Sequence, residues 1–140
     1  FTSKPIAKAL LEAKKRGVDV EIVVDKSQRG ERYTAADFTA NQGLPTYVDD
    51  RHAIAHNKIM LIDGETIVTG SFNFTKAAEE KNAENILLLK NFTGLLREYE
   101  RNYRLHREHS ERYRGKGEQL MPDEEGEEPV LSRKQGGRRR

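Results

Sequence analysis

The chain has 140 residues, a formal net charge of +2, 35% hydrophobic residues and no cysteine. This length suits one domain of ordinary size. The lack of cysteine excludes disulfides and thiolate catalysis, and the nearly balanced charge argues against a protein that coats nucleic acid. No apolar run approaches the ~20 residues of a membrane-spanning helix, so no stable membrane span is predicted.

The first part of the chain predicts a βαβ arrangement. Residues 3–16 have the pattern of a helix that Ser3 caps and Gly17 ends, and residues 18–24 follow as a short apolar strand. Helix, glycine and apolar strand form the second half of a βαβ unit, which favours a parallel sheet. The strand that should precede the helix is absent from the sequence, so we expect that an N-terminal part of the fold is missing.

The middle of the chain predicts short strands and one hairpin. Residues 44–48 form a strand that Pro45 should confine to an edge of the sheet. Residues 54–62 and 66–71 form two strands, and the Asp63-Gly64 pair between them predicts a tight turn.

The last elements are an apolar strand, a long helix and a tail. Residues 86–89 fit a buried strand, and residues 92–114 fit an amphipathic helix. Residues 115–140 have almost no core-forming side chains and cannot offset the entropy of ordering. We therefore predict an α/β domain at 1–114, with a mixed, mostly parallel central sheet flanked by helices, and a disordered charged tail at 115–140.

Polar side chains occupy the predicted hairpin, where apolar ones would be expected. Strand alternation puts His56 and Lys58 on one face, and Ser71 and Asn73 on one face of the next strand or just past it. An ammonium, an amide and a hydroxyl can hold phosphate oxygens, and histidine can act as nucleophile or acid. A carboxylate should fix the tautomer of His56, and Glu84 is the candidate. The hairpin therefore predicts a phosphoryl-transfer site.

The spacing of these residues resembles a catalytic signature. His56-x-Lys58, four residues, Asp63, six residues, then Gly70-Ser71-x-Asn73 resembles the HKD motif of the phospholipase D superfamily. The stretches GVDVEIVVD and TGSFNFTKAAEEKNAEN, with one motif copy per chain, are similar to the Nuc-type bacterial endonucleases of that superfamily. This resemblance covers residues 1–114. It implies the phospholipase D/nuclease fold without its N-terminal strand–helix–strand. It also implies a periplasmic or secreted location, although the sequence carries no targeting signal.

The resemblance also implies a role for each motif residue. His56 would attack phosphorus and form a phosphohistidine, Lys58 and Asn73 would bind phosphate oxygens, and Ser71 would assist in binding and orienting. Glu84 would hold His56. The two remaining motif positions, Asp63 and Gly70, are expected to be structural.

One motif copy supplies one histidine, whereas the mechanism uses a nucleophile and a general acid. We therefore expect a homodimer in which two copies of His56 face each other. His52 falls in a predicted turn, and His106 and His109 fall on a predicted exposed helix, so none of them replaces the second copy. No metal or cofactor is expected: a strand holds His52 and His56 too far apart for one ion, and the helical pair lacks a third buried ligand.

The predicted activity is metal-independent phosphodiester hydrolysis, most simply by a non-specific endonuclease acting on DNA or RNA. Phospholipase D-type hydrolysis of phospholipids is the alternative, ranked second because no basic amphipathic helix is evident. An inactive nucleic-acid-binding module is the alternative from another class.

Overall fold

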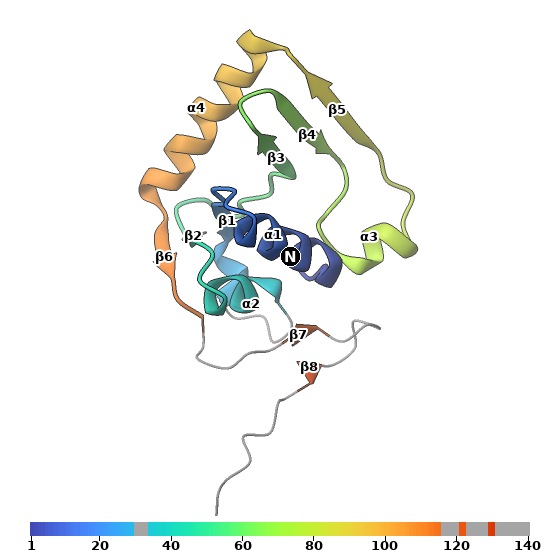
Figure 1. Ribbon diagram of the computed structural model, residues 1–140, viewed down its shortest axis with the longest axis vertical. Helices are drawn as coiled ribbons and strands as arrows, with labels where there is room; N and C mark the ends of the chain where they lie inside the picture. Colours follow the sequence, from blue (N-terminus) through green and yellow to red (C-terminus); the bar gives the residue numbers. More distant parts are fainter. Residues whose placement is uncertain (30–33, 116–120, 123–128, 131–140) are drawn as a thin grey trace, which may run out of the picture.

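A computed structural model describes residues 1–29, 34–115, 121–122 and 129–130 (Figure 1). In chain order, its elements are α1 (Lys4–Lys15), β1 (Ile22–Asp25), the 3₁₀ helix η1 (Lys26–Arg29), α2 (Ala35–Asn41), β2 (Thr46–Asp49), β3 (Ile59–Ile62), β4 (Thr66–Gly70), α3 (Lys76–Glu80), β5 (Ile86–Lys90), α4 (Thr93–His109), β6 (Glu111–Tyr113), β7 (Met121–Pro122) and β8 (Pro129–Val130). No helix among these residues has the length and apolar character needed to cross a bilayer.

The first sheet has the order β1-β2-β6 and carries the buried core. β1 and β2 are parallel, because η1 and α2 return the chain between them, and β6 is antiparallel to β2. One cluster, around Ala7 and Phe38, packs α1 against α2. A second cluster, of Val24, Ala36 and Val48, packs α2 on this sheet. Ser3 caps α1, as predicted, by accepting from the Ile6 N–H.

The strand after Pro45 lies in the centre of this sheet, so its predicted edge position is wrong. β2 begins at Thr46, one residue beyond the proline, and all its residues are buried. Pro45 therefore removes no donor from the strand itself, and its carbonyl accepts from the Ile22 N–H at 2.9 Å. Asp49, at the carboxyl end of β2, is completely buried.

The second sheet has the order β3-β4-β5 and is entirely antiparallel. The turn between β3 and β4 falls at Asp63 and Gly64, as predicted, with φ of 56° and 61°. The Glu65 N–H closes this turn on the Ile62 carbonyl at 3.1 Å. Positive φ at both central positions matches the right-handed twist of the flanking strands.

The predicted mostly parallel central sheet is wrong for the described strands, although the α/β class holds. β1 and β2 are the one parallel pair among them. The physical reason is connection length: a hairpin turn or a short link reverses the chain direction, whereas a parallel pair needs a longer crossover. In Figure 1, α4 runs from the β3-β4-β5 sheet down to the first sheet and so joins the two.

Several element predictions need correction at their ends or in their burial. The strand predicted from residue 18 begins only at Ile22. The strand predicted from residue 54 begins only at Ile59. The apolar strand β5 is not buried: Leu87 and Leu88 are 57% and 61% exposed. The long helix stops at His109, and the chain continues as β6.

The predicted disorder of 115–140 falls mostly outside the described residues. Within them, β7 and β8 pair in antiparallel fashion.

Candidate active site

A pocket of about 420 Å³ lies where the segment before β3, the end of β4 and one face of α4 meet. Its lining residues are His56, Asn57, Lys58, Ile59, Thr69, Gly70, Glu98, Tyr99 and Asn102. His56 and Lys58 therefore share a pocket, whereas Ser71 and Asn73, which the hairpin pattern placed beside them, do not line it. The three residues of α4 were not predicted, because only the packing of α4 against β3 brings them to the motif.

The segment that carries His56 and Lys58 is irregular rather than a strand. Strand alternation is therefore not what keeps these two residues together, since β3 starts after them. The Lys58 ammonium instead donates to the main-chain carbonyl of His56 at 2.9 Å. The His56 side chain is exposed and the Lys58 side chain is half-buried, so both are accessible to a substrate in the pocket.

Two aspartates hold the segment that leads to His56. Asp25 and Asp49 are register partners at the carboxyl ends of the parallel strands β1 and β2. Asp25 Oδ1 accepts from the Ala55 N–H at 2.7 Å, and Asp49 Oδ1 accepts from the Arg51 N–H at 3.0 Å. The first sheet thus fixes the path of the backbone before His56.

Both aspartates have pKa values below the ordinary 3.8. Burial by itself would raise the pKa of Asp25, but the N–H of Ala55 and the donors of Ser27 outweigh it by stabilising the anion. Burial would also raise the pKa of Asp49, but donors from three histidines and from the backbone hold it well below the ordinary value. Both side chains are therefore anions near neutral pH.

Ser71 and Glu84 form a second polar group, after the ends of β4 and α3. The Ser71 hydroxyl donates to Glu84 Oε2 and accepts from the Asn85 N–H at 3.0 Å. Glu84 Oε1 accepts from the Asn82 side chain at 3.2 Å. In this chain Glu84 contacts Ser71 and Asn82, and its role in holding His56 stays a prediction.

Gly70 allows this group to form. A Cβ at Gly70 would lie 2.2 Å from the Asn85 carbonyl oxygen, and its φ of +152° is unusual for other residues. The motif glycine is therefore explained by the close approach of two chain segments.

Asn73 lies on the segment between β4 and α3. Its side chain is exposed, and its carbonyl accepts from the Thr75 N–H at 2.7 Å. The flanking rings of Phe72 and Phe74 meet edge to face, with centroids 6.5 Å apart. Because Phe74 also accepts backbone bonds from Thr2 and Ser3, the start of the chain supports this segment.

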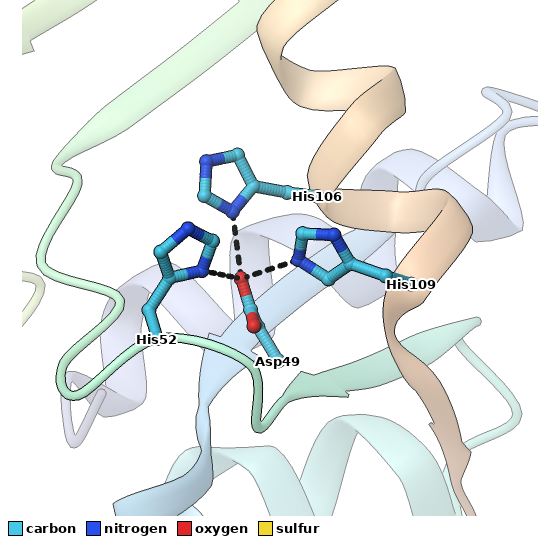
Figure 2. A group of neighbouring side chains, drawn as sticks. All are labelled: Asp49, His52, His106 and His109. Atoms are coloured by element: carbon cyan, nitrogen blue, oxygen red, sulfur yellow. Dashed lines mark hydrogen bonds and ion pairs between the residues drawn. The ribbon is translucent and has the colours of Figure 1, made fainter.

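Three histidines surround Asp49 beside the last turn of α4 (Figure 2). Asp49 Oδ2 lies 2.6 Å from His106 Nδ1, 3.0 Å from His52 Nδ1 and 3.1 Å from His109 Nε2. The prediction that His106 and His109 face solvent is wrong, since their side chains are 17% and 24% exposed. Their i,i+3 spacing was visible in the sequence, but the buried aspartate that gathers them lies 57 and 60 positions away.

Residues 1–105 match the family described as "Cardiolipin synthase, PLD-like domain". The chain belongs to the phospholipase D-like family. The matched residues contain the whole HKD motif and the pocket around it.

A solved phospholipase D-like relative supports the fold. The chain is similar to the phospholipase D family member Nuc from Salmonella typhimurium, at 41% identity and a TM-score of 0.78 over 82% of this chain and 77% of that one. NucT from Helicobacter pylori, at 22% identity and a TM-score of 0.66 over 81% and 77%, shares the fold.

Curated phospholipase D-like relatives match a smaller fraction of this chain and of their own length. "Phospholipase D" of Rickettsia bellii is 38% identical over 85 residues, which are 61% of this chain and 42% of that protein. "Mitochondrial cardiolipin hydrolase" of Xenopus laevis is 29% identical over 103 residues, which are 74% of this chain and 49% of that protein. The chain thus spans less than half the length of these two relatives.

Proposed function

We propose that this protein hydrolyses phosphodiester bonds through a covalent phosphohistidine on His56, with no metal ion at the reacting phosphate. The observation that carries the proposal is the shared pocket of His56 and Lys58, the two residues that open the HKD motif. A nucleophile beside a fixed positive charge suits attack on an anionic phosphate.

The chemistry proceeds in two displacements. A ring nitrogen of His56 attacks phosphorus, the bond from phosphorus to one ester oxygen breaks, and the departing oxygen takes a proton from a general acid. Water then attacks the phosphohistidine, gives a proton back to that group and releases the phosphomonoester. Lys58 and Asn73 bind the non-bridging oxygens and stabilise the charge that develops on them.

Ser71 and Glu84 have supporting roles in this proposal. The hydroxyl of Ser71 lies between Glu84 and the Asn85 N–H, so it is held in one orientation at the end of β4. From that position it helps to orient the phosphate. In this proposal, the negative charge of Glu84 stabilises the imidazolium form of His56 that the reaction passes through.

The general acid is His56 of a second copy of the chain. The other three histidines of the chain all contact Asp49 and are absent from the pocket. A homodimer with two facing copies of His56 supplies one nucleophile and one acid.

The substrate that we favour is nucleic acid, cut as by an endonuclease without sequence preference. The single motif copy and the likeness to Nuc support this choice. The names of the curated relatives, phospholipase D and cardiolipin hydrolase, support phospholipid as the second candidate.

The test is incubation of the purified protein with plasmid DNA, RNA and vesicles of phosphatidylcholine or cardiolipin, followed by acid-free trapping of the intermediate. DNA or RNA cleavage with phosphate label on His56 would support the proposal. Lipid turnover without nucleic-acid cleavage would favour the second candidate. Binding of nucleic acid without any turnover or label would instead indicate an inactive binding module.

A further inference from the structure

Four side chains from separate parts of the chain converge on one point beside α4 (Figure 2). Asp49 ends β2, His52 lies in the bend after it, and His106 and His109 occupy the last turn of α4. Each offers one ligand atom, and the four atoms lie within 4.8 Å of one another. None of them lines the pocket of the HKD residues.

The size of this cluster suits a metal ion. A tetrahedral Zn²⁺ with bonds of about 2.0–2.2 Å holds its ligand atoms about 3.3 Å apart. The three nitrogens lie 2.6, 3.0 and 3.1 Å from Asp49 Oδ2, so small side-chain shifts would produce that spacing. The other oxygen, Oδ1, already accepts from the Arg51 N–H, which orients the carboxylate and leaves Oδ2 for the ion.

The charges of the cluster also favour a bound metal ion. Three rings face one fully buried carboxylate, with ring centroids 4.7, 5.3 and 5.4 Å apart. If all three were protonated, three positive charges would surround one negative charge and repel one another. A dication instead accepts a lone pair from each neutral ring and from the carboxylate, which satisfies all four groups at once.

We propose that Asp49, His52, His106 and His109 bind one transition-metal dication of the Zn²⁺ type. Three imidazole nitrogens and one carboxylate oxygen favour such an ion over Mg²⁺ or Ca²⁺, which prefer oxygen ligands. Four protein ligands fill a tetrahedral ion, so the site is structural rather than catalytic. The ion joins the last turn of α4 to the bend at residues 51–53, which leads to the irregular segment with His56 and Lys58.

The test uses the full chain, stripped of metal by a chelator and titrated with Zn²⁺ against a chromophoric competitor. We expect one Zn²⁺ per chain, a higher Tm with Zn²⁺ and no such effect of Mg²⁺. Co²⁺ should give the visible absorption of a tetrahedral site. A stoichiometry well below one, or an equal response to Mg²⁺, would overturn the proposal.

The four histidines of the chain provide matched variants. His52→Ala should weaken Zn²⁺ binding by more than the roughly 10–100-fold that loss of an outer-shell partner causes. Its side chain is 47% exposed, so the fold should survive, and His109→Asn provides a second variant if it does not. His56→Ala should bind Zn²⁺ as the unaltered chain does. Unchanged affinity in both His52→Ala and His109→Asn, or loss of binding in His56→Ala, would show that the ion binds elsewhere.

Discussion

Asp25 Oδ1 accepts a hydrogen bond from the Ala55 N–H at 2.7 Å, directly before the proposed nucleophile His56. This bond joins the end of β1 to the segment that carries His56 and Lys58. That segment precedes β3 and belongs to no strand. Because the segment is irregular, side-chain contacts from the first sheet take over the positioning that a strand ladder would otherwise provide.

Asp25→Asn should lower the rate of phosphodiester hydrolysis by about 10-fold, as expected for a displaced catalytic group. Asp25 uses its two oxygens to accept from Ala55 and Ser27, and an asparagine has one acceptor oxygen for these two N–H groups. The measurement is kcat/KM on a chromogenic phosphodiester. Asp19→Asn, at an exposed position, is the control, and equal rates for the two variants would contradict a positioning role.

The same contact predicts an acid-dependent stability difference. The folded-state pKa of Asp25 is below 3.8, so its contribution to stability is complete above that value and is lost as pH falls through the folded-state pKa. The free energy of unfolding of the unaltered chain should therefore exceed that of Asp25→Asn near neutral pH. The difference should shrink as pH drops below about 4. Denaturant titrations across this pH range measure the difference. A difference in free energy of unfolding that grows as pH falls would contradict the prediction.

His56→Ala should lower turnover by about 10³-fold or more and abolish the covalent intermediate, since the nucleophile is removed. Peptide mapping of trapped enzyme should place the phosphate of the unaltered chain on His56 and not on the nearby His52. The variant should keep the sedimentation behaviour of the unaltered chain, because the His56 side chain is exposed. Label that persists in the variant would identify a different nucleophile.

The proposed dimer predicts that specific activity falls on dilution. Each site requires His56 from two chains, so activity should decline in parallel with the dimer fraction measured by sedimentation. Substrate at saturating concentration is needed, so that dilution of the protein is the one variable. Specific activity that stays constant while the protein dissociates to monomers would rule out a shared site.

The variant His52→Ala can distinguish a metal ion with a structural role from a metal ion that takes part in hydrolysis. His52→Ala should no longer bind the ion firmly, so EDTA should leave its remaining activity unchanged. EDTA should lower the activity of the unaltered chain, because loss of the ion loosens the bend before His56. Loss of all activity in both proteins, with recovery on Mg²⁺ addition, would show that a metal ion acts at the phosphate.

Gly70→Ala should destabilise the fold by about 1–3 kcal/mol, because the new methyl group would overlap the Asn85 carbonyl. Gly94→Ala is the matched control: nothing lies within 4 Å of a Cβ there, and α4 already includes this position. Its effect should be neutral or stabilising by about 0.5–1 kcal/mol. Urea denaturation compares the two, and equal stabilities would mean that Asn85 moves aside at little cost.

Local sequence determined the features that depend on near neighbours. The cap at Ser3, the turn at Asp63-Gly64 and the helical character of α4 follow from capping chemistry, positive φ and apolar periodicity. The HKD spacing likewise predicted the family, because the motif lies within 18 consecutive residues. It did not predict that His56 and Lys58 would line a pocket without Ser71 and Asn73.

Tertiary structure alone decided what depends on distant neighbours. An apolar run does not reveal what packs on the faces of its strand: α2 packs on β2, which is buried, whereas β5 is exposed. Histidines three positions apart on a helix do not reveal which buried carboxylate they meet. Asp49 meets His106 and His109 because β2 and the last turn of α4 pack together, and that contact is set by the shape of the whole core rather than by any local pattern.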